Sequence, residues 1–198
     1  MLVALVDWPA SRPGAMDTAL PKALACQILA HPDGFPWVIQ DIGLLGLRMD
    51  DSREYRMHVW DPAFADVEAP IHDHPFDFVS FVIAGEMTNT RYVEDPAGTE
   101  YGRARYPPGN EDARTTDTVR LSAMAAETYS QGAHYVQLAH ELHDSHQLPG
   151  TVTIIRRAHK DVRELTVCRR DGRWVPGRSR PATAEEVTRI TAKALSWF

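Results

Sequence analysis

The spacing of hydrophobic residues changes twice along the chain. Residues 17–30 have a helical period, residues 35–175 carry the short alternating or β-branched runs of strands, and residues 183–198 return to a helical period. The first helix can be capped by Asp17 or Thr18, and the last begins at a capping box, Thr183-Ala184-Glu185-Glu186. The connections between strands are short, which favours antiparallel pairing. The pattern therefore predicts an all-β barrel or sandwich with a helix at each end.

Turn residues divide the β region into individual strands. We expect a hairpin from 44–49 and 55–60 with its turn at 50–53, and Asp61-Pro62 should end the second strand. Residues 94–117 are polar and rich in Gly, Pro, Asn and Asp, which predicts a long loop that could act as a lid. Thr118–Leu121 and Glu127–Ser130 read as separate short strands, and 165–169 with 172–175 as a final hairpin.

The run from Phe78 to Ile83 is apolar at almost every position. A strand of this kind must be covered on both of its faces. The interior of the barrel covers one face, and either the N-terminal helix or a second subunit must cover the other. We therefore expect a packed N-terminal extension or a homodimer.

Length and charge limit the classes of partner. The chain has 198 residues and a net charge of −6, so one domain is expected, and nucleic acid or an anionic membrane is not expected as a partner. We divide it into an N-terminal extension with one helix (1–43), a β-barrel (44–175) and a C-terminal helix (176–198). Cys26 and Cys168 are far apart and no apolar run is long enough for a membrane span. A cytoplasmic protein is the expectation from these features.

The stretch His72-Asp73-His74 is the strongest candidate for chemistry. Two histidines two residues apart in a β-favouring run share one face of a strand, with Asp73 pointing to the other face. A third histidine, His143, could complete a set of three imidazoles that binds a metal ion and leaves positions open for substrate. Each imidazole then needs an acceptor for its other nitrogen, for which we considered Asp73, Asp77, Asp144 or a backbone carbonyl.

Candidate substrate-binding residues follow from the alternation of the strands. Arg56, His58 and Trp60 share the face opposite Tyr55, Met57 and Val59, and this face is either an outer surface or the lining of a polar cavity. Arg156 or Arg157 could bind a carboxylate, although alternation turns one of them outward. The side chains of Phe76, Phe78 and Trp60 would supply an apolar wall.

At these positions the sequence resembles the cupin superfamily. The first cupin motif is Gly-x5-His-x-His-x3–4-Glu-x6-Gly, and here His72, His74 and Gly85 fall at its spacings, with Phe78 in place of the glutamate and Asp66 in place of the leading glycine. The second motif is Gly-x5-Pro-x-Gly-x2-His-x3-Asn. Its first glycine and its histidine correspond to Gly132 and His143, whereas the other three positions hold Leu138, His140 and Gln147. The resemblance covers roughly residues 55–157.

The resemblance implies a cupin-type antiparallel jelly-roll barrel with a metal site at His72, His74 and His143. Because the glutamate is replaced, the site looks like that of the cysteine dioxygenase-like branch, which the resemblance associates with Fe(II) and oxygen; Zn, Mn, Ni or Cu are the alternatives. The cysteine of that branch's Cys–Tyr crosslink is not evident near Val79. Asp77, if a bulge at Pro75 turned it inward, and His140 are the candidates for an extra ligand or for a residue that supports a ligand.

Three functions are consistent with this site. The first is a metal-dependent enzyme, an iron oxygenase acting on a small polar or anionic metabolite. The second is a non-redox isomerase, epimerase or lyase, in which the metal polarises a carbonyl or a histidine acts as base. The third is a module that binds a small molecule without turnover. Metal content and oxygen consumption distinguish them, whereas the sequence identifies neither the substrate nor the residues that carry out catalysis.

Overall fold

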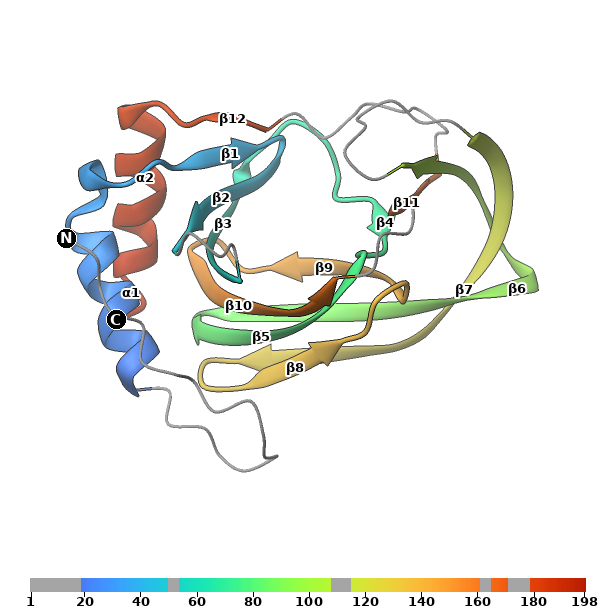
Figure 1. Ribbon diagram of the computed structural model, residues 1–198, viewed down its shortest axis with the longest axis horizontal. Helices are drawn as coiled ribbons and strands as arrows, with labels where there is room; N and C mark the ends of the chain where they lie inside the picture. Colours follow the sequence, from blue (N-terminus) through green and yellow to red (C-terminus); the bar gives the residue numbers. More distant parts are fainter. Residues whose placement is uncertain (1–18, 50–53, 108–114, 161–164, 171–178) are drawn as a thin grey trace.

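The strands pair in two antiparallel sheets whose order is that of a jelly roll (Figure 1). The computed structural model of the chain describes residues 19–49, 54–107, 115–160, 165–170 and 179–198. One sheet contains, in order, β3 (Tyr55–Ala65), β10 (Thr151–Lys160), β5 (Phe76–Ala84) and β8 (His134–Gln137). The other contains, in order, β4 (Ile71–His72), β9 (Leu142–Gln147), β6 (Glu86–Tyr106) and β7 (Thr115–Ser130). Along the chain these eight strands change sheet at every connection except the one from β6 to β7, and the first, β3, lies beside the last, β10, which is the arrangement of a double-sheet jelly roll. The predicted all-β antiparallel fold with a helix at each end is confirmed.

The larger sheet has seven strands because three more are added beyond β3. In order across the sheet they are β12 (Ser179–Pro181), β1 (Val38–Gln40), β2 (Ile42–Arg48), β3 (Tyr55–Ala65), β10 (Thr151–Lys160), β5 (Phe76–Ala84) and β8 (His134–Gln137). The edge pair β1 and β12 comes from opposite ends of the chain. The sheet therefore includes residues on both sides of the 44–175 segment.

Two helices lie side by side against one face of this sheet, at the left of Figure 1. They are α1 (Ala19–Ala30) and α2 (Ala184–Leu195), and a short 3₁₀ turn, η1 (Pro32–Gly34), follows α1. Their buried side chains, including Leu29 and Ile190, form one core with Phe81 and Ile83 of β5. Each such side chain contributes about 2 kcal/mol by leaving water. Because helices of the same chain cover this face, the apolar strand does not by itself require a second subunit, and the homodimer stays a prediction.

The ends of the helices show how their limits are set. The predicted capping box is present at α2: Thr183 accepts a hydrogen bond from the backbone N–H of Glu186, whose carboxylate accepts one from the backbone of Thr183. Helix α1 ends at the predicted position, just before Pro32. Its proposed caps, Asp17 and Thr18, lie outside the described residues. No helix among the described residues is long and apolar enough to cross a membrane.

The smaller sheet packs against the free face of the larger one. Its strands, in order, are β11 (Leu165–Arg169), β4 (Ile71–His72), β9 (Leu142–Gln147), β6 (Glu86–Tyr106) and β7 (Thr115–Ser130). A second buried cluster contains Met87 of β6 together with Phe78, Val82 and Tyr135 of the larger sheet, so apolar side chains join the two sheets. We call the face of the seven-stranded sheet that takes part in this contact the inner face.

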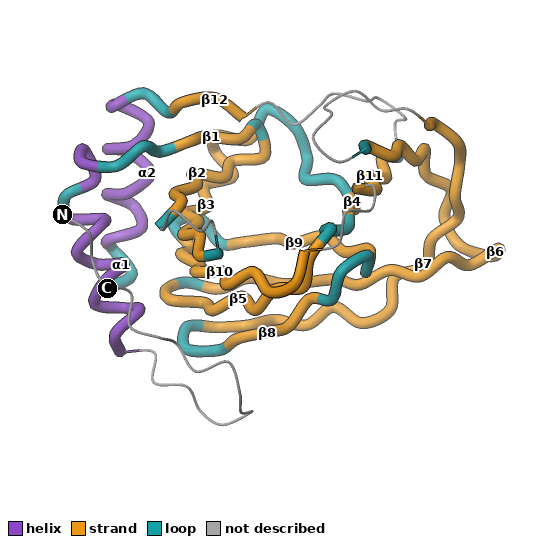
Figure 2. Tube along the Cα trace, in the orientation of Figure 1, coloured by secondary structure: helices purple, strands orange, loops and turns teal. Residues whose placement is uncertain are grey.

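The prediction of a long loop over residues 94–117 is wrong. Most of this segment forms a long hairpin of β6 and β7, which extends away from the helices (Figure 2). Most of its polar side chains are exposed, and charged ones pair with each other: Arg103 lies 2.8 Å from Glu94 of the same strand and 2.6 Å from Asp117 across the hairpin. The two short strands expected at 118–121 and 127–130 are parts of β7. Residues 108–114 lie outside the described part.

The prediction that Asp61-Pro62 ends a strand is also wrong. Strand β3 continues to Ala65, because its pairing with β2 shifts register between Leu44 and Ile42. Pro62 lies within this irregularity, where its missing N–H does not break a regular ladder. Residues 172–175 of the predicted final hairpin lie outside the described residues, as does the turn at 50–53 of the first hairpin. Strand β11 pairs with β4 and β6.

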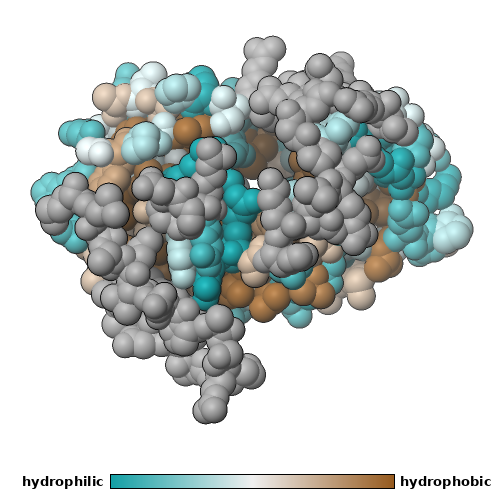
Figure 3. All heavy atoms as spheres, in the orientation of Figure 1, coloured by the Kyte–Doolittle hydropathy of each residue, from teal (hydrophilic) through white to brown (hydrophobic). Residues whose placement is uncertain are grey.

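Apolar side chains also reach the surface near β8. Val136 and Leu138 are 47% and 51% exposed. On the face drawn in Figure 3, hydrophobic residues gather over the region of β5 and β8, beside a band of hydrophilic residues near the centre. The exposed surface at this edge of the sheet is therefore partly apolar.

Candidate metal centre

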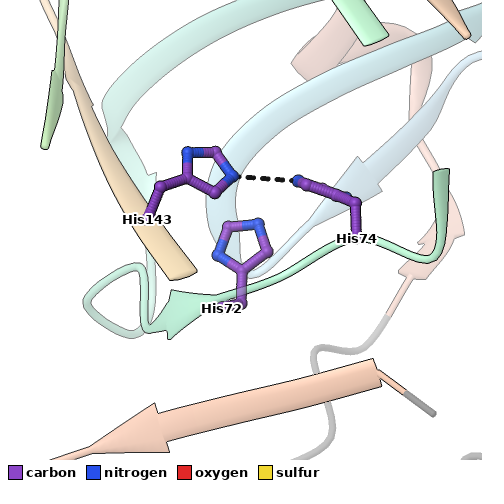
Figure 4. A group of neighbouring side chains, drawn as sticks. All are labelled: His72, His74 and His143. Carbon is purple, nitrogen blue, oxygen red and sulfur yellow. Dashed lines mark hydrogen bonds between the residues drawn. The ribbon is translucent and has the colours of Figure 1, made fainter. Parts of the chain in front are cut away.

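The fold brings His72, His74 and His143 together, as predicted. One ring nitrogen of each lies within 4.8 Å of the others, and Figure 4 shows the three rings turned toward one another. His72 on β4 is directly opposite His143 on β9, so both side chains project from the same face of the smaller sheet. His74 follows β4, which is only two residues long. We call these three residues the histidine cluster.

Asp73 is not exposed, although it separates the two histidines. It is only 4% accessible, and its carboxylate accepts a hydrogen bond from the backbone N–H of Thr166 (2.7 Å). Its own N–H donates to the carbonyl of Thr166 (3.1 Å). The strand thus ends in a fixed conformation. The carbonyl of His74 accepts a hydrogen bond from the N–H of His140 (3.0 Å), which holds this turn against the segment before β9.

The Nδ1 atoms of two cluster histidines are held by oxygen acceptors. His72 Nδ1 lies 3.0 Å from the carbonyl oxygen of Pro70, and His143 Nδ1 lies 2.7 Å from Oδ1 of Asn89. A carbonyl or amide oxygen can only accept a hydrogen bond, so each Nδ1 carries the proton. In a neutral imidazole the other nitrogen, Nε2, then presents its lone pair. Both histidines are therefore fixed in the tautomer that can bind a metal through Nε2.

Asn89 was not singled out in the sequence. It is 1% exposed, and its Nδ2 donates to Oε1 of Gln137 (3.3 Å), which is fully buried. Ser145 also donates to Oδ1 of Asn89 (3.2 Å), which fixes the orientation of the amide. The sequence signal was weak: Asn89 sits two residues after Met87 in a strand whose alternate residues are buried. A polar amide at such a position indicates a buried partner.

None of the three aspartates considered as acceptors is hydrogen-bonded to a cluster nitrogen. Asp73 binds the backbone of Thr166, as described above. Asp77 Oδ1 accepts from the N–H of Ala139 (2.7 Å), and Asp144 Oδ2 accepts from the hydroxyl of Tyr92 (2.8 Å). The acceptors are instead a carbonyl and an amide. Neutral acceptors leave the imidazoles less basic than carboxylates would.

All three imidazoles favour the neutral form. Burial lowers the pKa of His72, and it lowers the pKa of His74 and His143 well below the ordinary value, with a further decrease from the charge of neighbouring His72. The charge of Arg157 also lowers the pKa of His74, and that of Arg91 lowers the pKa of His143. Neutral imidazole is the form that binds metals, so the cluster is ready to bind at neutral pH.

The donor set fits a divalent metal ion. His74 Nε2 lies 3.1 Å from His143 Nε2, so two nitrogens that can both carry lone pairs face each other. Without an ion, His74 must donate its proton to satisfy His143; with an ion, both can act as ligands. Three imidazoles leave further coordination positions open. The cluster found among the described residues contains no carboxylate.

Phe78 stands at the position where the cupin motif has glutamate, and its side chain lies beside the histidine cluster. Its ring centroid lies 5.0 Å from that of His74 and 6.2 Å from that of His143. The apolar ring thus replaces a charged ligand. The other two candidates lie outside the cluster: Asp77 binds Ala139, and His140 lies 3.7 Å from Asp73. His140 has φ = 63°, the left-handed conformation that explains why the motif has glycine there.

The face that carries Arg56, His58 and Trp60 is the inner one. His58 pairs with Thr153, which in turn pairs with Val82 of the second core cluster. Residues paired across strands project from the same side. Burial, and then the charge of Arg56, lowers the pKa of His58 to about 3. Trp60 Nε1 donates to Oγ1 of Thr153 (3.4 Å). This face therefore points toward the interior rather than forming an outer surface, and its role in binding substrate stays a prediction.

Of the two neighbouring arginines, the structure places Arg157, not Arg156, near the cluster. Arg157 pairs with Phe78, and its guanidinium lies 3.8 Å from the centroid of the Phe76 ring. Arg156 projects from the other face and donates to Oε1 of Glu54 (2.6 Å). Alternation showed that only one could face inward, but its direction depends on the register of β10 against β5.

Comparison with known proteins does not assign the chain to a family. No protein-family model and no curated protein matches the chain. Among solved structures, the chain is similar to a cupin-like protein from Thermotoga maritima, with 11% identity, a TM-score of 0.22, and coverage of 80% of this chain and 89% of that chain. The jelly-roll order of the strands and the meeting of the three histidines are the fold and the residue group that the resemblance to cupins implied.

Proposed function

We propose that the protein is a metal-dependent enzyme, an iron oxygenase that acts on a small polar or anionic metabolite. The observation that carries this proposal is a cluster of three neutral imidazoles without a carboxylate. A divalent ion there would keep most of its charge, which favours an anionic substrate as a further ligand. Iron(II) in this position would supply one-electron chemistry toward dioxygen.

Arg157 is the residue best placed to bind an anionic group. Its charge acts on His74, and the Phe76 ring against which it lies restricts its position. A guanidinium can bind a carboxylate through two parallel hydrogen bonds, which fixes orientation as well as charge. Arg56 is a second cation on the inner face, where its charge acts on His58. Together they support the choice of an anionic substrate.

The remaining wall of the site is aromatic. Phe76, Phe78 and Tyr135 are all less than 9% exposed, and the ring centroids of Phe78 and Tyr135 lie 6.0 Å apart. Burial raises the pKa of Tyr135 to about 12, so its hydroxyl stays protonated at neutral pH. These side chains exclude water around bound substrate, and Tyr135 holds a proton on this wall.

The test starts with the metal. Protein purified without added chelator should contain close to one divalent ion per chain, and His143→Ala should lose it. The iron(II)-loaded protein should then consume oxygen with some members of a panel of small carboxylates and amino acids. Zinc-loaded protein is the matched control and should consume none. Full metal stoichiometry in His143→Ala would contradict the three-histidine site.

Arg157 and Arg156 provide a matched pair for the substrate prediction. With a substrate identified by oxygen consumption, Arg157→Met should raise KM at least about tenfold, because it removes a charge-assisted hydrogen bond of about 1.5–3 kcal/mol. Arg156→Met should leave KM unchanged. Turnover of a carbonyl substrate by the zinc form would instead favour a non-redox isomerase or lyase, and binding without turnover a binding module.

A further inference from the structure

A cavity lies on the side of the smaller sheet that faces away from the histidine cluster. Its volume is about 580 Å³, and it is bounded by β4, β6, β9, β11 and the segment 66–70. Alternation along β9 explains its position: His143 projects to one side of the sheet and Asp144 to the other. We call it the outer cavity. Its lining includes Ile71, Tyr92, Tyr101, Asp144, Cys168 and Arg170.

One part of the outer cavity is apolar. Ile71, Tyr101 and Cys168 are at most 7% exposed and belong to a separate buried cluster, against which Tyr92 packs. This cluster is independent of the two that join the sheets and the helices. Two tyrosine rings and an isoleucine in one cavity provide a surface for the flat or aliphatic body of a small molecule.

The polar groups of the outer cavity have both signs of charge. Asp144 Oδ2 accepts a hydrogen bond from the Tyr92 hydroxyl (2.8 Å), while its Oδ1 is buried and has no hydrogen-bond partner among the described residues. The exposed guanidinium of Arg170 lies 5.7 Å from the centroid of the Tyr101 ring. Burial and the bond to Asp144 raise the pKa of Tyr92, so its hydroxyl remains a donor and leaves the carboxylate to act as acceptor.

We propose that the outer cavity is a second ligand site, which binds a small zwitterion with an apolar side chain, such as an aromatic amino acid. The ammonium group would bind Asp144, whose incompletely bonded carboxylate prefers a cationic donor. The carboxylate of the ligand would bind Arg170, and its side chain would pack on Ile71 and the two tyrosines. The site uses none of the groups assigned to the histidine cluster, so it does not depend on the proposed function.

Three probes that differ in charge test this assignment. Calorimetry on metal-free protein should detect binding of L-phenylalanine. Phenethylamine lacks the carboxylate and 3-phenylpropanoate lacks the ammonium group, and each should bind at least about tenfold more weakly, since each loses one charge-assisted contact. Equal binding of L-phenylalanine and one of these probes would overturn the zwitterion assignment, and no binding of L-phenylalanine at millimolar concentration would overturn the site.

Variants locate the binding in the outer cavity. Asp144→Asn should weaken L-phenylalanine binding at least about tenfold, by removing the charge that pairs with the ammonium group. The matched control is Asp95→Asn, because Asp95 also accepts a hydroxyl hydrogen bond, from Ser122 (2.6 Å), but lies outside the outer cavity. Unchanged affinity in Asp144→Asn would contradict the proposal.

Two further variants distinguish binding in the outer cavity from an effect of misfolding and from binding at the histidine cluster. Tyr92→Phe removes only the hydroxyl that donates a hydrogen bond to Asp144. It should change the affinity for L-phenylalanine, whereas the thermal unfolding midpoint should change little. His143→Ala should bind L-phenylalanine as the unaltered chain does. Loss of binding in His143→Ala, with binding retained in Tyr92→Phe, would place the ligand at the histidine cluster and overturn the assignment.

Discussion

His143 Nδ1 lies 2.7 Å from Oδ1 of Asn89, and both side chains are at most 3% exposed. This bond keeps the proton on Nδ1 and directs Nε2 toward the other two histidines. We predict that Asn89→Ala lowers metal affinity about 10- to 100-fold, the usual effect of removing a group that orients a ligand. Competition with a chromophoric chelator measures the dissociation constant.

Asn89→Asp is the informative control for this prediction. A carboxylate at position 89 can still accept the proton of Nδ1, so most of the affinity lost in the alanine variant should be kept. A structural role for Asn89 alone predicts another result, namely that Asp, as a buried charge, behaves as badly as Ala. Unfolding midpoints of both metal-free variants show whether any loss of affinity reflects loss of folding.

Phe78 should control the charge of the site. Its ring lies beside His74, at the motif position that carries glutamate in the cupin motif. We predict that Phe78→Glu binds divalent metal at least about tenfold more tightly than Phe78→Gln, because an added anionic ligand offsets the charge of the ion. The Gln variant has nearly the same shape without the charge. Equal affinities would mean that position 78 does not reach the metal.

The sequence contained enough information to predict the histidine cluster, because its signal is local. His72 and His74 are two residues apart. The glycine that ends the first motif, Gly85, and the glycine that begins the second, Gly132, have φ = 78° and 88°. A position that requires positive φ is recognisable in a sequence as glycine. Hydrophobic spacing likewise predicted both helices and most strands.

Other features depended on pairing that a sequence does not specify. Whether Arg156 or Arg157 faces the cluster is decided by the register of β10 against β5, and a shift of one residue exchanges them. The bond from Asn89 to His143 joins residues 54 positions apart. The polar segment 94–117 resembled a loop because few of its side chains are buried. Tyr101 and Ala104 are buried, but they are three residues apart, so the segment lacks the alternation by which a half-buried strand is recognised.

The low pKa of His58 predicts a pH dependence of stability. The folded protein keeps His58 neutral down to about pH 3, whereas the unfolded chain protonates it near 6.5. Between these values the unfolded state binds more protons, so the free energy of unfolding must fall as the pH falls, by at most about 1.4 kcal/mol per pH unit from this group. Urea unfolding of metal-free protein at pH 6.5 and 5 measures this slope.

His58→Gln should make that slope shallower, because it removes one of the groups that take up a proton on unfolding. His134→Gln is the matched control: His134 is exposed on β8. The interpretation of His58 as a buried neutral imidazole fails if both variants keep the slope of the unaltered chain.

Three glycines separate the cost of backbone conformation from the cost of a steric clash. A Cβ at Gly34 or at Gly132 would meet no atom within 4 Å, but only Gly132 has positive φ, 88°. At Gly85, which also has positive φ, a Cβ would lie 2.5 Å from Oγ1 of Thr151. Gly132→Ala should therefore destabilise the protein by about 1 kcal/mol through the backbone alone, and Gly34→Ala should be neutral or stabilise it by up to about 1 kcal/mol. Gly85→Ala adds the clash and should cost the most. Urea unfolding gives the order, and equal effects at Gly34 and Gly132 would show that the turn before β8 does not need its left-handed residue.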